Sequence, residues 1–236
     1  MKLTKIITIT GTMTCVSGLH IGGNSDGTKV GGSDNPIIKN PVDGKPYIPG
    51  SSVKGVMRSI LEKSLDIGSK KENHTFTKDG KDLGYNGSPC RCGKPGCMAC
   101  TLFGAHINPN PTCGEPRLRV FDMQLNKEFE ETLINRGMSF YDIIENVSST
   151  MINRNTGTAS GGALRSTERL AAGAKFDCKF VVKIFEGDNE KKILSTVENL
   201  ITRLEDFGLG AKTSSGSGVV KFDINWDDVQ SEPIGF

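Results

Sequence analysis

Alternating apolar and polar positions predict the strands of this chain. Residues 2–15 alternate in this way and are rich in β-branched side chains, which is typical of a β-strand. Residues 175–185 give the clearest pattern, because five apolar side chains share one face: Phe176, Cys178, Phe180, Val182 and Ile184. Residues 116–124 and 218–224 are predicted as two further strands.

Apolar residues spaced by three and four positions predict three helices. Ser51 or Ser52 can cap the first helix at its N-terminus. The buried stripe of this helix consists of Val53, Met57, Ile60 and Leu61. Residues 191–207 show a second amphipathic pattern, and residues 126–136 predict a short helix.

The four strands and the two long helices follow the order β-α-β-β-α-β, which is the ferredoxin-like pattern. We therefore predict an α+β fold with a ferredoxin-like (RRM-like) palm, in which an antiparallel sheet carries two helices on one face. A chain of 236 residues is expected to form one domain with a single core. Two insertions interrupt the palm. Residues 66–113 have little hydrophobic periodicity and should be held by something other than a core, whereas residues 138–174 include a polar stretch suited to an extended hairpin.

Four cysteines crowd into eleven residues of the first insertion: Cys90, Cys92, Cys97 and Cys100. Glycine and proline between them let a short loop curl around a tetrahedral ion, and zinc prefers thiolate ligands. The N-terminus carries no export signal, so we expect reduced thiols and a metal rather than disulfides. Four protein ligands leave no open position, which makes the predicted zinc structural. His74 or Cys113 remain alternatives to one of the four cysteines.

Basic residues are unevenly distributed along the chain. Net charge is +2, but the first 120 residues hold 16 Lys and Arg against 9 acidic residues, whereas the rest hold 13 against 18. This asymmetry allows a polyanion-binding face on a nearly neutral protein. No stretch approaches the roughly 18 apolar residues of a membrane span, so we expect a cytoplasmic protein without membrane contact.

Two glycine-rich turns are candidate phosphate sites. Residues 49–55 lie at a predicted helix N-terminus, where unpaired N–H groups and the helix dipole favour an anion. The polar side chains of this turn and the first helical turns are Ser51, Ser52, Lys54 and Arg58. Residues 208–218 carry Lys212 and lead from a helix into a strand, the reverse of a P-loop, which favours a phosphate backbone over ATP or NAD. Ordinary capping and a flexible loop are the alternatives.

His20 and Asp34 are the candidate catalytic side chains, and both lie in the glycine-rich residues 18–35. Such a loop can present a carboxylate to a bound strand, and a histidine can transfer protons near neutral pH. Asp-Asn-Pro is also ordinary turn chemistry, and a single histidine is more often structural. Both interpretations stay open on these residues alone.

Several stretches taken together carry a family resemblance: GLHIGGN, GGSDNP, PYIPGSSVKGVMRS, the cysteine-rich insertion, RNTGTASGGALRSTERLAAGAKF and GLGAKTSSGSG. They resemble the repeat-associated mysterious protein (RAMP) superfamily, and within it the backbone subunits of the Csm complex of CRISPR type III-A. The resemblance implies that residues 66–113 form a zinc-stabilised lid and residues 138–174 a thumb hairpin. It also implies a filament of copies of this chain along CRISPR RNA, together with other Csm subunits.

The same resemblance implies cleavage of guide-paired target RNA at regular intervals with Mg²⁺ or Mn²⁺. Asp34 matches the cleaving aspartate of the family, His20 its loop histidine and Lys54 its helix lysine. The residues expected to contact the RNA backbone are Ser51, Ser52, Lys54, Arg58, Arg154, Arg165 and Lys212.

Three other functions are weighed against this one. A non-catalytic guide-RNA-binding scaffold would use Asp34 only to shape its loop. A guide-processing endonuclease would rely on histidine or tyrosine acid–base chemistry and seldom carries such a cysteine insertion. A zinc-dependent DNA-binding module is disfavoured because the cysteine cluster lacks an obvious basic recognition helix.

Overall fold

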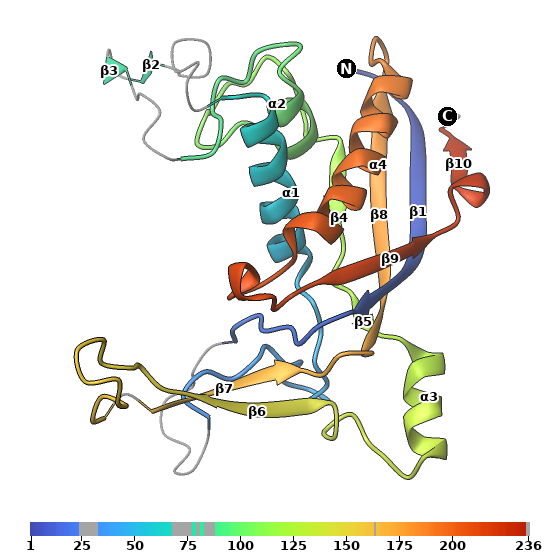
Figure 1. Cartoon of the computed structure of the whole chain (residues 1–236). Helices are drawn as coiled ribbons and strands as arrows, with labels where there is room; N and C mark the ends of the chain where they lie inside the picture. Colours follow the sequence, from blue (N-terminus) through green and yellow to red (C-terminus); the bar gives the residue numbers. More distant parts are fainter. Residues whose placement is uncertain (24–32, 68–76, 79–80, 83–87, 163, 235–236) are drawn as a thin grey trace.

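An antiparallel sheet forms the centre of the fold in a computed structural model of the chain (Figure 1). The described residues are 1–23, 33–67, 77–78, 81–82, 88–162 and 164–234. The strands of the central sheet are β1 (Leu3–Cys15), β4 (Leu118–Val120), β5 (Gln124–Leu125), β8 (Lys175–Phe185), β9 (Val220–Ile224) and β10 (Gln230–Pro233). They follow the order β10-β1-β8-β4, with β5 also paired to β8 and β9 also paired to β1. The prediction of a mixed α and β fold around an antiparallel sheet is confirmed.

β1 and β8 form the long central pair, and β8 has the bounds that its alternation predicts. Phe176 and Phe180 on β8 expose none of their surface. Burying a side chain of this size stabilises the fold by about 1.5–3 kcal/mol. The single strand predicted over residues 116–124 is wrong, since β4 and β5 are separate. Between them Met123 pairs instead with Ile48, which draws the chain away from β8.

Two helices, α1 (Gly50–Ser64) and α4 (Glu190–Phe207), lie on one face of this sheet (Figure 1). Both bury the predicted apolar stripes, which join the strands in one hydrophobic cluster. The short helix α3 (Lys127–Asn135) is confirmed, and the Asn126 side chain caps it by accepting a hydrogen bond from the Phe129 N–H.

The predicted serine cap of α1 is wrong. The helix begins at Gly50, so Ser51 and Ser52 lie within its first turn, and no side chain of the N-cap residue Pro49 bonds the helix. Asp122, beyond β4, instead accepts a hydrogen bond of 2.8 Å from the Gly50 N–H. A carboxylate from a distant part of the chain therefore occupies one donor of this helix N-terminus.

The cysteine-rich insertion has more of a core than the sequence predicted. Besides β2 (Thr77–Lys78) and β3 (Lys81–Asp82), it contains the short helix α2 (Met98–Phe103). Leu102 and Phe103 of α2 are buried in the same hydrophobic cluster as the residues of α1. The expectation that this insertion lacks a core is wrong for residues 88–113, because their apolar residues belong to the main hydrophobic cluster of the fold and α2 contacts α1.

The second insertion contains a two-stranded hairpin, β6 (Ile144–Ser149) paired with β7 (Arg165–Leu170). In Figure 1 it extends away from the central sheet. Two short 3-10 turns complete the described elements, η2 (Thr213–Ser215) and η3 (Trp226–Asp228). Within the described residues, every helix is too short or too polar to cross a bilayer.

A buried ion pair joins the residue directly before β4 to the turn after β8. Arg117 donates two hydrogen bonds of 2.9 Å to Asp188, and only 5% and 12% of the two side chains are exposed. Burial disfavours the charged form of Asp188. Hydrogen bonds from Arg117 and the Phe185 N–H nevertheless outweigh burial and lower its pKa.

We expect Asp188→Asn to reduce the free energy of unfolding by about 3 kcal/mol, because it leaves the Arg117 charge buried without a counter-charge. Since the folded-state pKa of Asp188 lies below its unfolded value, this contribution is complete above about pH 4 and is lost as the pH falls through the folded-state pKa. Urea unfolding across this pH range measures both effects. Glu115→Gln removes an exposed ion pair with Lys183 and should cost no more than about 1 kcal/mol. Equal losses in the two variants would contradict the prediction.

Candidate functional site

The outer edge of β7 gathers the two candidate catalytic segments. One edge of β7 pairs with β6, and the other bonds to residues 19–20 and 34–35. Leu19 and Leu170 exchange two backbone hydrogen bonds, and Asn35 bonds to Ser166 and to Glu168. His20 and Asp34, which are far from β7 in sequence, are thus attached to the same strand.

Asp34 is exposed and is held by its side chain. Its Oδ2 atom accepts a hydrogen bond of 2.8 Å from the Ser166 N–H, across 132 positions of sequence. The Ser33 hydroxyl lies 3.4 Å from that of Ser166. The carboxylate is therefore fixed to β7 while remaining accessible to a ligand.

His20 is bonded to β7 two residues further along. Its Nδ1 atom lies 2.6 Å from the Glu168 carbonyl oxygen. A carbonyl oxygen can only accept, so Nδ1 carries the hydrogen, and Nε2 of the neutral ring is the acceptor. Residues two apart on a strand are separated by roughly 7 Å. The structure therefore brings His20 and Asp34 into one neighbourhood on β7.

The glycine-rich turn after α4 supports the His20 segment from the other side. The Ala211 N–H donates to the His20 carbonyl oxygen at 3.0 Å, and the Gly218 N–H donates to the Gly18 carbonyl oxygen at 2.9 Å. Gly210 has a φ of +76°, and a Cβ there would collide with the His20 carbonyl oxygen. This glycine is required by close backbone approach, so the turn is not merely a flexible connection.

Glu168 is a residue of this site that the sequence did not indicate. Its side chain accepts hydrogen bonds from the Ile37 N–H at 3.1 Å and from Lys39 Nζ at 2.8 Å. Its backbone bonds to His20 and Asn35. Only its place in the polar stretch predicted as a hairpin was visible in the sequence, because these partners lie more than 125 positions away.

The predicted cationic residues fall in different places. Lys54 is half-buried on α1, where burial lowers the pKa of its ammonium group and the charge of Arg58 lowers it further. Arg154 lies exposed at the tip between β6 and β7, and Arg165 is exposed at the start of β7. Lys212 is exposed and has a left-handed φ of +62° beside the turn that supports His20.

Arg58 differs from these residues because its guanidinium group forms hydrogen bonds within the protein. Its Nε atom lies 2.7 Å from Glu62 Oε1, and its Nη2 atom donates to the Cys90 carbonyl oxygen at 2.6 Å. Only 15% of its side chain is exposed.

The four cysteines converge as a metal site requires. Their ligand atoms all lie within 4.8 Å of one another, and the closest Sγ pairs are 3.6 to 3.9 Å apart. Sulfurs at about 2.3 Å from a tetrahedral zinc would be about 3.8 Å apart. Hydrogen bonds among the four thiols lower the pKa of Cys92 and Cys97 and raise that of Cys100. Cys113 is outside this group, and His74 lies outside the described residues.

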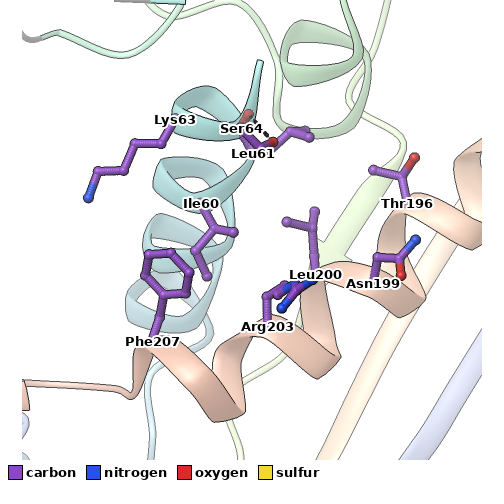
Figure 2. A pocket seen from close by; sticks show the side chains of 9 residues that line it. All are labelled: Ile60, Leu61, Lys63, Ser64, Thr196, Asn199, Leu200, Arg203 and Phe207. Atoms are coloured by element: carbon purple, nitrogen blue, oxygen red, sulfur yellow. Dashed lines mark hydrogen bonds between the residues drawn. The ribbon is translucent and has the colours of Figure 1, made fainter. Parts of the chain in front are cut away.

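A hollow of about 650 Å³ lies between α1 and α4 (Figure 2). It is lined by Ile60, Leu61, Lys63, Ser64, Thr196, Asn199, Leu200, Arg203 and Phe207. Within the part of the chain that the structure describes, this lining contains no carboxylate, no imidazole and no thiol. The hollow therefore offers no group for the chemistry that His20 and Asp34 suggest.

Comparison with known proteins gives one matching family and several relatives. Residues 12–221 match the model of the RAMP superfamily. The chain is 34% identical over 230 residues to the CRISPR system Cms endoribonuclease Csm3 of Methanothermobacter thermautotrophicus, with 94% of this chain and 85% of the relative covered. It is also 34% identical over 207 residues to the protein of that name in Methanocaldococcus jannaschii, with 87% and 74% covered.

Two solved structures share the fold. A chain in the crystal structure of a Csm3–Csm4 subcomplex of the type III-A CRISPR–Cas interference complex gives a TM-score of 0.57 at 22% identity, covering 99% of this chain and 90% of that one. A chain in the cryo-EM structure of a type III-B Cmr-beta complex bound to cognate target RNA gives 0.59 at 12% identity, covering 92% and 96%.

Proposed function

This chain belongs to the RAMP superfamily and to its family of Csm3 endoribonucleases, and from that premise we propose that it is a backbone subunit of a type III-A CRISPR effector complex. It binds CRISPR RNA, assembles with copies of itself and with other Csm subunits, and cuts the target RNA that pairs with the guide. The observation that carries the proposal is the attachment of His20 and Asp34 to one edge of β7.

The arrangement of elements supports the finer architecture. In the order β9-β1-β8-β4 with α1 and α4 on one face, the central sheet has the strand order of a ferredoxin-like (RRM-like) palm. The β6–β7 hairpin and its exposed tip support a thumb within residues 138–174. The cysteine cluster supports a zinc-stabilised lid within residues 66–113.

Cleavage proceeds by attack of a target 2′-OH on the adjacent phosphorus. An A-form duplex resists the in-line geometry, so the thumb turns one target nucleotide out of the stack. The P–O5′ bond breaks, leaving a 2′,3′-cyclic phosphate and a 5′-OH. Asp34 accepts the 2′-OH proton, or His20 accepts it through Nε2 where Asp34 would hold the metal at the edge of β7, and the leaving 5′-oxygen takes its proton from water.

Mg²⁺ or Mn²⁺ would stabilise the negative charge that develops on the phosphate. Asp34 is the residue that would hold the ion. Among the described residues, the cysteine cluster is the single group of three or more metal-ligating side chains. One carboxylate alone binds such ions weakly, so RNA phosphates would have to complete the coordination and metal binding would require substrate.

Lys54 binds a guide phosphate near the N-terminus of α1, with help from the exposed Ser51. Lys54→Gln is expected to weaken guide binding at every guide sequence and to reduce the slope of log affinity against log salt by about one. Lys63→Gln, at the other end of the same helix, is the matched control and should leave the slope unchanged. Fluorescence anisotropy with labelled guide RNA at several salt concentrations measures both, and equal slopes for wild type and Lys54→Gln would contradict the assignment.

The exposed Arg154, Arg165 and Lys212 provide further backbone contacts, together with Ser52 in the first turn of α1. These contacts neutralise phosphates without reading bases. Binding should therefore be independent of guide sequence and sensitive to salt.

The assembled complex tests the activity. Wild-type chain, guide RNA and partner subunits are incubated with complementary RNA in Mg²⁺, in Mn²⁺ or in EDTA. Cuts at regular intervals that require metal support the nuclease. Target binding without cleavage would leave the second candidate, a non-catalytic guide-binding scaffold, which accounts for the same basic residues.

A further inference from the structure

We propose that Arg58 and Glu62 are positioning residues of the cysteine metal site, which they serve by clamping the backbone of Cys90. This inference rests on the structural metal proposed above. It assigns Arg58 to the lid rather than to the RNA backbone.

The clamp holds both polar groups of the Cys90 residue. Glu62 Oε1 accepts a hydrogen bond of 2.9 Å from the Cys90 N–H, and Arg58 Nη2 donates one of 2.6 Å to the Cys90 carbonyl oxygen. The two side chains are themselves joined by the 2.7 Å contact of Arg58 Nε with Glu62 Oε1. The His106 N–H also donates to the Cys90 carbonyl oxygen, at 3.1 Å.

This arrangement fixes the direction of a metal ligand. When the N–H and the C=O of one residue are both held, its φ and ψ are fixed, and with them the direction of the Cα–Cβ bond. The Cys90 Sγ atom lies 3.6 Å from those of both Cys92 and Cys100. A small rotation of the Cys90 backbone would spoil these spacings, which match the edges of a zinc–thiolate tetrahedron.

Charge and burial support the same role. Only 15% of the Arg58 side chain and 11% of the Glu62 side chain are exposed, and a buried ion pair is maintained where its remaining hydrogen bonds are satisfied. Four thiolates around a divalent ion carry a net charge of −2. The Arg58–Glu62 pair is neutral overall, so it holds the Cys90 backbone without adding to that charge.

The position of the clamp on α1 links two sites. Lys54, Arg58 and Glu62 are spaced by four residues and lie on one stripe of the helix. The stripe begins with the proposed guide contact and ends at the metal site. The helix thereby holds the lid at a fixed position relative to the guide.

The full-length chain tests the clamp through metal affinity. Co²⁺ is titrated into the metal-free protein and followed by its thiolate charge-transfer absorption, and Zn²⁺ affinity is obtained by competition. Glu62→Ala and Arg58→Lys are expected to weaken binding by about 10- to 100-fold. Glu62→Gln retains an oxygen that accepts from the Cys90 N–H and should recover much of the loss. Arg203→Gln, which removes an exposed ion pair on α4, is the control and should bind as wild type does.

The outcomes distinguish a failure of the proposed clamp from a failure of the proposed metal site. Tight binding by wild type and equally tight binding by Glu62→Ala and Arg58→Lys would overturn the clamp and leave the metal site intact. No binding by folded wild type would overturn the metal site itself. Circular dichroism establishes that each variant is folded, and if Glu62→Ala is not, the graded comparison of Arg58→Lys and Glu62→Gln decides.

A second measurement concerns Arg58 alone. Arg58→Gln should leave the salt dependence of guide binding unchanged, because its guanidinium bonds to the lid. A slope reduced by about one, as for a lost phosphate contact, would overturn the assignment of Arg58 to the clamp.

Discussion

Replacing Asp34 by alanine is expected to reduce target-RNA cleavage by the assembled complex about 100- to 10,000-fold, with target binding preserved. The carboxylate is the proposed base or metal ligand. Among the described residues, its side chain accepts one hydrogen bond, from the Ser166 N–H, at an exposed position, so its loss should cost only about 1 kcal/mol of stability. Denaturing gels of labelled target give the rate, and filter binding gives the affinity.

The variant Asp34→Asn distinguishes a role of Asp34 in the cleavage chemistry from a role in shaping its loop. Asparagine keeps an oxygen that can accept from the Ser166 N–H but has no charge. If Asp34 only shapes its loop, Asp34→Asn should have the same activity as wild type. If Asp34 is the base or metal ligand, it should be nearly as inactive as alanine. Asp43→Asn, in a nearby exposed turn, is the matched control and should retain full activity.

Replacing Cys100 by serine is expected to remove the structural metal and to loosen the lid. A buried thiol at the centre of the cluster is lost, and structural zinc sites contribute on the order of 10 kcal/mol of apparent binding free energy. Because α2 carries Cys100 and also buries Leu102 and Phe103, we expect the free energy of unfolding to fall by several kcal/mol. Metal analysis of the purified chain should give one zinc in wild type and none in the variant.

Cys113→Ser provides the control. Cys113 is buried but lies outside the four-thiol group, so this variant should retain one zinc and nearly all of the stability lost in Cys100→Ser. Loss of zinc in Cys113→Ser with retention in Cys100→Ser would reverse the ligand assignment.

Some features of this protein were determined by short stretches of sequence. The bounds of β8 and α4 follow from apolar periodicity, since side-chain alternation and the 3.6-residue repeat are local properties of the backbone. The cysteine cluster was predictable for a similar reason. Its ligands lie within eleven residues, so a single loop brings them together. The resemblance of several motifs then indicated Asp34, His20 and Lys54.

Neighbouring residues in the sequence were not enough to predict several features of this structure. It offered Ser51 or Ser52 as the cap of α1, but Asp122 bonds to the helix start. It predicted an RNA contact for Arg58, which the proposed clamp on Cys90 assigns to the metal site instead. It also missed α2, whose six residues are too few to show a helical period.

The site itself was decided by tertiary structure. His20 bonds to β7 across 148 positions and Asp34 across 132. Most bonds at this edge involve backbone N–H and C=O groups, which every residue except proline carries in the same form. Backbone pairing of this kind therefore cannot be recognised from the identities of the residues. The sequence therefore named the candidate catalytic side chains, and only the pairing of β7 with residues 19–20 and 34–35 decided that they lie on one strand edge.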